Sequence, residues 1–111
     1  MPQVICNAIL PAEHTIRRGT SLNVLLVMES SGPIAAAPVC FWGSDGNTWR
    51  ELLREQREFP EAGHVHLYFN IPADRFLAPF WGGQAPEEVS LYVGDAPPQR
   101  PDGDVLVFIQ D

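Results

Sequence analysis

The sequence predicts an all-β protein, an antiparallel β-sandwich of about seven short strands that forms a single domain over residues 1–111. Three observations lead to this prediction. A chain of 111 residues has the size of one domain with one hydrophobic core. Its 11 prolines and 9 glycines are too many for long helices and suit short strands joined by turns. Several short segments also alternate apolar and polar residues with the period of two that is typical of a half-buried strand.

The first part of the chain contains three segments with strand character. Residues 4–10 are apolar except for Asn7 and end at Pro11, which cannot donate to a β-ladder. The segment 14–19 follows and leads into an Arg-Gly-Thr turn. Residues 21–29 form the clearest strand, because every second residue is apolar and points to one face. That face carries Leu22, Val24, Leu26 and Met28, and the other face is apolar too, with Leu25 and Val27.

A turn signal at residues 43–47, which include Asp-Gly, follows a short apolar strand at residues 38–42. Asp-Gly between two hydrophobic segments is typical of a β-hairpin, which requires a return strand. Thr48 and Glu51 also match a helical capping box, so residues 48–58 have two interpretations, helix or strand. The hairpin signal favours a return strand whose charged residues lie along an exposed edge.

The second part of the chain continues the strand pattern. In residues 64–71 apolar side chains alternate with polar ones, which predicts a strand with one wet face. The proline-rich connection at residues 72–88 is long enough to cross between two sheets, and residues 73–77 are expected to form a helical turn within it. Residues 89–93 and 104–109 are the last two strands, and the loop that joins them contains prolines that restrict its backbone.

The order of these strands resembles that of immunoglobulin-like and fibronectin type III-like domains. The resemblance depends on a strand with Trp42 in the third position of the series, a penultimate strand with Tyr92, and the final strand at residues 104–109. It implies a β-sandwich fold and no particular function. The immunoglobulin disulfide would join the second and sixth strands, whereas Cys6 and Cys40 fall on the first and third, so an antibody-type domain is not implied.

Charge and targeting signals narrow the classes of partner. Fourteen acidic against seven basic side chains give a formal net charge of -7, which excludes the basic surface expected of a nucleic-acid binder or of a protein that docks on anionic membranes. The sequence shows no secretory signal and no apolar stretch of membrane-spanning length, so we expect a cytoplasmic protein or a component of an assembled particle. Two cysteines are too few for a disulfide framework, and both a reduced pair and a bridge remain open.

No motif for catalysis or for a cofactor is present. The sequence lacks the Gly-x-Ser-x-Gly elbow, the glycine-rich phosphate loop and the His-Glu-x-x-His pattern, so we expect no enzyme, no catalytic residue and no cofactor. His64 and His66 point to one face of a strand, but no third ligand follows them, and we expect no metal site. Asp95, Asp102 and Asp104 flank one loop without the spacing of a calcium-binding EF-hand.

The expected function is therefore that of a protein-interaction or structural assembly subunit, whose partner is another copy of the chain or another protein. Two surfaces are predicted: an apolar outer face of the sheet that contains the last two strands, and an aromatic loop at residues 76–83. The residues predicted to bind a partner are Trp42, Phe76, Phe80, Trp81, Tyr92, Leu106 and Phe108.

Both surfaces have a second interpretation. The connection at residues 72–88 could fold over the apolar sheet face, or the strand phase could be shifted by one residue. The aromatic loop could instead plug the open end of the sandwich. The alternative function is carbohydrate binding, in which exposed Trp and Tyr side chains form platforms for sugar rings. The candidates for such platforms are Trp42, Trp49, Trp81 and Tyr92.

Overall fold

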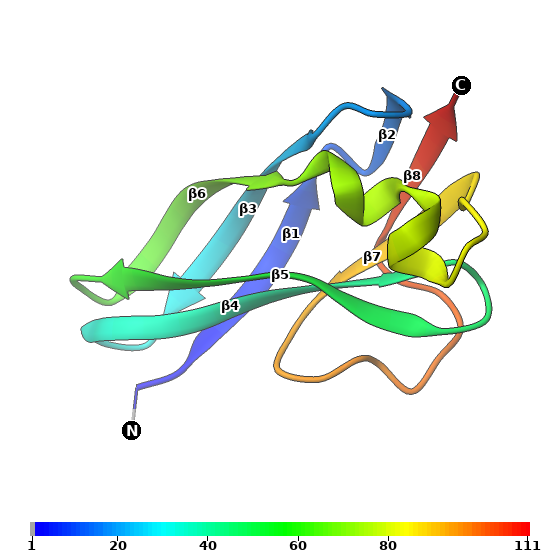
Figure 1. Ribbon diagram of the computed structural model, residues 1–111. Helices are drawn as coiled ribbons and strands as arrows, with labels where there is room; N and C mark the ends of the chain where they lie inside the picture. Colours follow the sequence, from blue (N-terminus) through cyan, green and yellow to red (C-terminus); the bar gives the residue numbers. More distant parts are fainter. Residues whose placement is uncertain (1) are drawn as a thin grey trace.

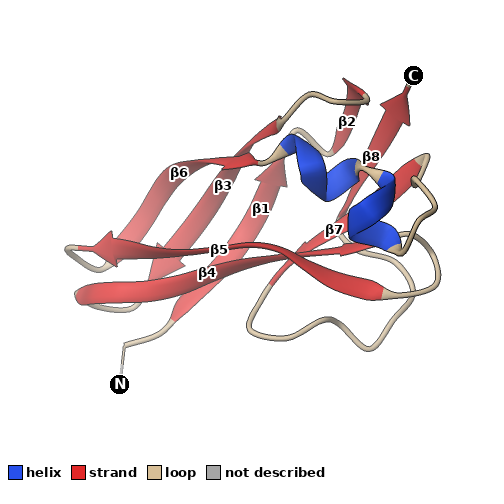
Figure 2. Ribbon diagram, in the orientation of Figure 1, coloured by secondary structure: helices blue, strands red, loops and turns tan. Residues whose placement is uncertain are grey.

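The computed structural model describes residues 2–111, and it confirms the predicted all-β sandwich (Figure 1). Two sheets lie face to face, and the strands account for most of the structure (Figure 2). The smaller sheet has the order β1-β3-β6 and consists of β1 (Val4–Leu10), β3 (Leu22–Ser30) and β6 (Gly63–Ile71). The larger has the order β2-β8-β7-β4-β5, with β2 (Glu13–Arg17), β8 (Val105–Gln110), β7 (Glu88–Val93), β4 (Ile34–Ser44) and β5 (Trp49–Phe59). The described chain thus has eight strands where the sequence predicts about seven.

The connection between β6 and β7 crosses from the smaller sheet to the larger one, as predicted. It contains two short 3-10 turns, η1 (Ala73–Phe76) and η2 (Ala78–Trp81), and the first coincides with the predicted helical turn. Both turns lie at one end of the sandwich, beside the first residues of β5 (Figure 1). Over residues 2–111, no helix has the length and apolar character needed to cross a membrane.

Strand β1 has apolar residues at both odd and even positions, and a β-bulge explains this pattern. Its register against β3 shifts between Cys6 and Ala8, so that Asn7 is the extra residue. Before the bulge Cys6 packs against the core, and after it Ile9 is buried in the core. Strict alternation would place Ile9 on the same face as the exposed Ile5. The bulge therefore allows both halves of β1 to bury an apolar side chain.

The chain changes sheets immediately after β1. Pro11 ends the pairing with β3, and β2 then joins the larger sheet beside the last strand, β8. This pair is parallel, with His14 opposite Val107, so the expectation of a purely antiparallel sandwich is wrong here. A parallel pair is possible here because β2 and β8 lie far apart in the chain and no tight turn joins them.

The segment after the Asp-Gly turn is a strand, so of the two interpretations the hairpin is correct and the helix is wrong. β4 and β5 pair antiparallel along their length. The Asp45 carboxylate accepts hydrogen bonds from the backbone N–H groups of Asn47 (2.9 Å) and Thr48 (3.0 Å), and Gly46 adopts the positive φ that the turn requires. Burial raises the pKa of the Asp45 carboxyl, but the backbone N–H groups and the nearby charge of Arg50 together outweigh it, so that the pKa is lowered.

The core lies between the two sheets, where every strand contributes side chains on its inward face. Phe41 on β4 and Phe69 on β6 meet edge to face across the sandwich, with ring centroids 5.1 Å apart. This contact joins β4 of the larger sheet to β6, an edge strand of the smaller sheet, and an edge-to-face pair of this kind stabilises the fold beyond its burial of apolar area. The largest fully buried side chains are Phe41, Phe59, Phe76, Leu26, Leu52, Ile71 and Leu91.

Gly43 shows how closely the larger sheet is packed. A Cβ atom at this position would lie 2.7 Å from Cδ1 of Leu52 and 3.0 Å from Cγ1 of Val89. We expect Gly43→Ala to lower the free energy of unfolding by about 1–3 kcal/mol, because the new methyl group would overlap Leu52. In a Leu52→Ala background, which removes the nearest atoms, the same substitution should have a smaller effect. Urea unfolding of the wild type, the two single variants and the double variant measures this coupling, and strictly additive losses would contradict it.

Candidate functional site

The outer face of the larger sheet carries the first predicted surface, in the predicted phase. Trp42 on β4 and Tyr92 on β7 are register partners on this face. Leu106 on β8 is 36% exposed and Phe108 is half-buried beside it. The inward face of β7 and β8 carries the buried residues Val89, Leu91, Val105, Val107 and Ile109. The alternative of a strand phase shifted by one residue is therefore wrong.

A loop folds over the aromatic part of this face, and it is the loop between β7 and β8. The Trp42 indole Nε1 donates a hydrogen bond to the backbone oxygen of Gly94 (2.9 Å). Trp49 Nε1 donates to the backbone oxygen of Arg100 (3.1 Å), and the Arg100 guanidinium stacks over Tyr92 at 5.5 Å. The alternative that the β6–β7 connection covers this face is wrong, because that segment packs at the end of the sandwich. Partner binding by these half-buried aromatics stays a prediction.

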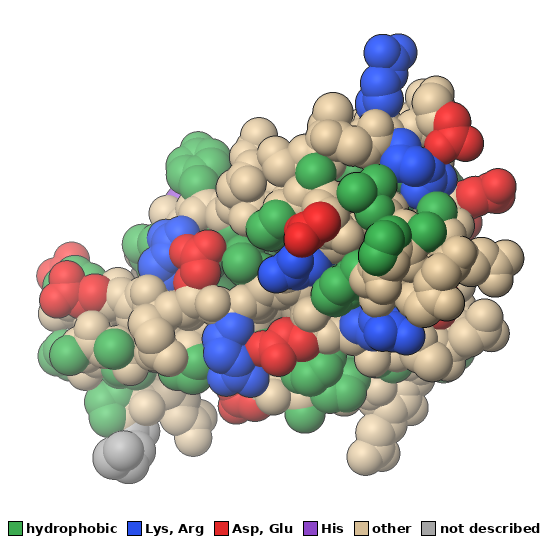
Figure 3. Space-filling model, viewed as in Figure 1, with side chains coloured by type: hydrophobic (Ala, Val, Ile, Leu, Met, Phe, Trp, Pro, Cys, Tyr) green, Lys and Arg blue, Asp and Glu red, His purple; other side chains and the backbone are tan. Residues whose placement is uncertain are grey.

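The aromatic loop plugs the end of the sandwich. Phe76 and Trp81 are buried in the core, and Trp81 Nε1 donates a hydrogen bond to the backbone oxygen of Arg75 (2.7 Å). Phe80 is half-buried between Trp81, 5.7 Å away, and the Arg75 guanidinium, 5.3 Å away. Figure 3 shows apolar side chains and arginines side by side over these turns. The expectation that Phe76 and Trp81 form a surface anchor is therefore wrong, since the end of the core needs an apolar cover.

A third surface, which was not predicted as a binding surface, is the outer face of the smaller sheet. Leu10, Leu25 and Tyr68 lie side by side across β1, β3 and β6. Tyr68 is 73% exposed, Leu10 42%, and Ile5, farther along β1, 53%. Of the large hydrophobic side chains exposed in residues 2–111, only Leu106 lies elsewhere. We call this surface the Tyr68 face; it consists of Ile5, Ala8, Leu10, Leu25, Val27, Glu29, His64, His66 and Tyr68.

Glu29, His64 and His66 of the Tyr68 face lie at the end that is remote from Leu10. Asn23 and Asn70 continue the same face beyond Leu25 and Tyr68. His64 Nε2 lies 3.3 Å from Oε1 of Glu29, and Asn7 Nδ2 donates a hydrogen bond to the same oxygen (3.2 Å). His66 is on this face as well, opposite Val27. The part of the chain that the structure describes contains no group of three or more His, Cys, Asp or Glu side chains that could hold a metal ion.

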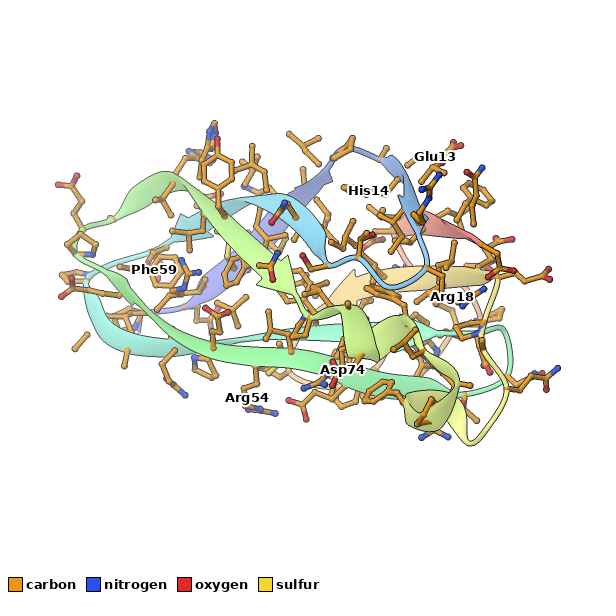
Figure 4. The ribbon with its side chains drawn as sticks, turned by 45° about the horizontal axis from the view of Figure 1, so that its top comes forward. Glu13, His14, Arg18, Arg54, Phe59 and Asp74 are labelled. Carbon is orange, nitrogen blue, oxygen red and sulfur yellow. The ribbon has the colours of Figure 1, made fainter. Side chains whose placement is uncertain are left out.

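The third histidine, His14, is separate from this pair because it points into the protein from β2. Figure 4 shows His14 inside the molecule while its neighbour Glu13 points outward, and His14 is buried. Within the described residues its Nε2 atom has no hydrogen-bond partner. Burial lowers the pKa of the His14 imidazole, although a hydrogen bond with the backbone of Pro11 opposes this effect. The lowered pKa favours the neutral form of the imidazole.

The two cysteines are free thiols, so the bridge that the sequence left open does not form between them. Cys40 is buried and Cys6 half-buried. Burial is the main cause that raises the pKa of both thiols. A raised pKa keeps the thiol protonated and makes it a poor nucleophile, which is typical of a structural cysteine.

Comparisons with known proteins show similarity of fold. No family model matches the sequence, and no curated protein matches it. Solved structures of a β-glucosidase from Listeria innocua match the whole chain. The complex with isofagomine is 14% identical with a TM-score of 0.65, the D270A mutant with laminaribiose is 13% identical at 0.65, and the complex with glucose is 13% identical at 0.64. In each case the present chain covers 16% of the β-glucosidase chain. At this identity, the match establishes the fold alone.

The buried His14 should make the stability of the fold sensitive to mild acid. Its pKa is lowered in the folded state, so below the ordinary value of 6.5 the unfolded chain binds more protons than the folded one. The free energy of unfolding should therefore decrease as the pH falls below 6.5, by at most about 1.4 kcal/mol per pH unit for this one group. Urea unfolding between pH 7.5 and 5.5 measures this dependence. His14→Phe, which keeps an aromatic ring but cannot titrate, should flatten the profile, and an unchanged profile would contradict the assignment.

Proposed function

We propose that this chain is a non-catalytic docking module that works by protein contact, and that the Tyr68 face is its working surface. The observation that carries the proposal is the continuous apolar row of Leu10, Leu25 and Tyr68 across all three strands of the smaller sheet. An outer face that only meets water normally carries polar residues. Contiguous exposed apolar side chains are typical of surfaces that bind another protein.

Two further observations support protein contact. Most of the other predicted surface is covered by the chain itself, since the β7–β8 loop lies over Trp42 and Tyr92 while Phe76 and Trp81 fill the core. Leu106 is the one large hydrophobic side chain of residues 2–111 that is exposed outside the Tyr68 face. The similar β-glucosidase structures contain this fold as about one sixth of a longer chain. A small sandwich that accompanies a larger protein needs a face on which to pack, and the Tyr68 face fits that need.

A matched pair of surface variants tests the proposal. The combined Leu10→Ser and Tyr68→Ser substitutions remove the ends of the apolar row, and Leu106→Ser removes the exposed leucine of the other sheet. We expect the double variant to bind its partner, a second copy of the chain or another protein, at least about tenfold more weakly than the wild type, which is a change of roughly 1.4 kcal/mol. The control variant should bind as the wild type does. Sedimentation velocity measures binding to a second copy, and quantitative affinity capture measures binding to other proteins.

Both variants should remain folded, because the substituted side chains are exposed. Circular dichroism and urea unfolding check this point. The docking proposal would be wrong if the affinity for the partner fell equally in the two variants. It would also be wrong if the wild type bound neither itself nor another protein.

Carbohydrate binding is a second candidate, and one residue favours it. The four predicted platforms are held by the chain itself, because Trp81 is buried and the β7–β8 loop bonds the indole N–H groups of Trp42 and Trp49. The Arg100 guanidinium of the same loop stacks over the ring of Tyr92. Tyr68, in contrast, presents an exposed ring with Asn70 beside it on the same strand face. The structures with similar folds include complexes with laminaribiose and glucose.

A β-glucan retardation assay separates this candidate from protein docking. If Tyr68 is a sugar platform, electrophoresis in a gel that contains laminarin should retard the wild type but not Tyr68→Ala. The loss of one stacking aromatic should weaken binding about tenfold, by analogy with other aromatic contacts. Leu106→Ala is the matched control and should migrate like the wild type. Equal migration of all three proteins with and without laminarin would remove the carbohydrate candidate.

A further inference from the structure

Apart from the Tyr68 face, the sandwich has a groove along the free edge of its first strand. Strand β1 is the end strand of the smaller sheet and pairs only with β3. Two adjoining hollows follow its first half and share Val4, Pro38 and Asp95 as lining residues. We call them together the β1 groove. One wall is residues 2–6, and the other is the first half of β4 with the beginning of the β7–β8 loop.

The backbone of β1 leaves hydrogen-bonding groups unpaired on the side of this groove. The Ser31 backbone N–H donates a hydrogen bond to the backbone oxygen of Gln3 (2.9 Å), so the backbone groups of Gln3 point to the β3 side. The direction of the backbone N–H and C=O groups alternates along a strand. The backbone groups of Ile5 therefore also point to β3, whereas those of Val4 and Cys6 point to the free edge. The bulge at Asn7 ends this regular edge. The groups that another strand could pair with are therefore those of Val4 and Cys6.

The opposite wall is less suited to pairing. β7 pairs with β4 only from Phe41 to Ser44, so the first half of β4 has no strand on this side. Pro38 lies there, and a proline has no backbone N–H to donate. This wall therefore contributes apolar surface, while β1 contributes the backbone groups.

The charge of the groove indicates what chemistry would fit it. Among the residues that line the two hollows, Asp95 is the only one with a charged side chain, and it is exposed. It takes part in none of the ion pairs formed within residues 2–111. The chain as a whole has a net charge of -7. A ligand with a basic group next to apolar side chains would complement such a groove.

We infer that the β1 groove binds an extended peptide by strand addition to β1. The peptide pairs with the free backbone groups of Val4 and Cys6, places alternate apolar side chains against the wall around Pro38, and directs a lysine or arginine to Asp95. In this mode of recognition backbone hydrogen bonds supply affinity and the alternate side chains supply specificity. The inference concerns a different surface from the Tyr68 face and does not depend on it.

The test uses two synthetic peptides and the intact chain labelled with ¹⁵N. The probe is acetyl-Lys-Val-Thr-Val-Thr-Val-amide, and the control has the same sequence with every backbone nitrogen methylated, which prevents strand pairing but keeps the charge and the side chains. In NMR titrations we expect the probe to shift the amide signals of Val4 and Cys6 downfield, as new hydrogen bonds do. The methylated peptide should leave both signals in place.

Two surface variants test the charge. Asp95→Asn should lower the affinity for the probe peptide about two- to fivefold at low ionic strength, and the difference from the wild type should decrease at high salt. Asp102→Asn removes an equal charge from an exposed residue outside the groove and should have a smaller effect. The inference would be overturned by equal binding of the two peptides, by no binding at millimolar probe, or by shifts confined to Leu25 and Tyr68, which would place the peptide on the Tyr68 face.

Discussion

The unequal width of the two sheets is the constraint on which the rest of the structure depends. Five strands face three, so the smaller sheet cannot cover the whole apolar face of the larger one. The Phe41–Phe69 contact holds β4 against β6, and the two 3-10 turns close the end of the sandwich beside the first residues of β5. Arg75 fixes these turns to β5 through a hydrogen bond from its Nε to the Leu52 backbone oxygen (2.8 Å). Phe76 and Trp81 of the aromatic segment are thus part of the core, which explains why they are not available as a surface.

Much of this fold could be predicted because strand alternation is a local property of the sequence. The pattern of β3 and β6 places the correct residues in the core, and the Asp45-Gly46 turn indicates the hairpin. The bulge at Asn7 and the parallel pairing of β2 were not predictable in the same way. Both depend on which strand lies alongside, and this is decided by packing between residues far apart in the chain.

The surfaces were harder to predict than the core for the same reason. Alternation correctly assigns Tyr68 to the wet face of β6, and it shows that Leu25 and Val27 make the outward face of β3 apolar. Only the register across β1, β3 and β6 joins these residues into one surface. The loop that covers Trp42 could not be predicted either, because its position depends on a hydrogen bond between residues that are 52 positions apart in the sequence. The resemblance to immunoglobulin-like and fibronectin type III-like domains stays a prediction.

All three tryptophans have the same arrangement, and it gives the protein a spectroscopic property. Each indole N–H donates a hydrogen bond to a backbone oxygen outside the strands or in a turn: Trp42 to Gly94, Trp49 to Arg100 and Trp81 to Arg75. Every tryptophan therefore senses the position of a connecting segment more directly than the pairing of the sheets. The intrinsic fluorescence of the protein is consequently a measure of how well its loops are held, and its emission should change when a loop detaches even if both sheets remain intact.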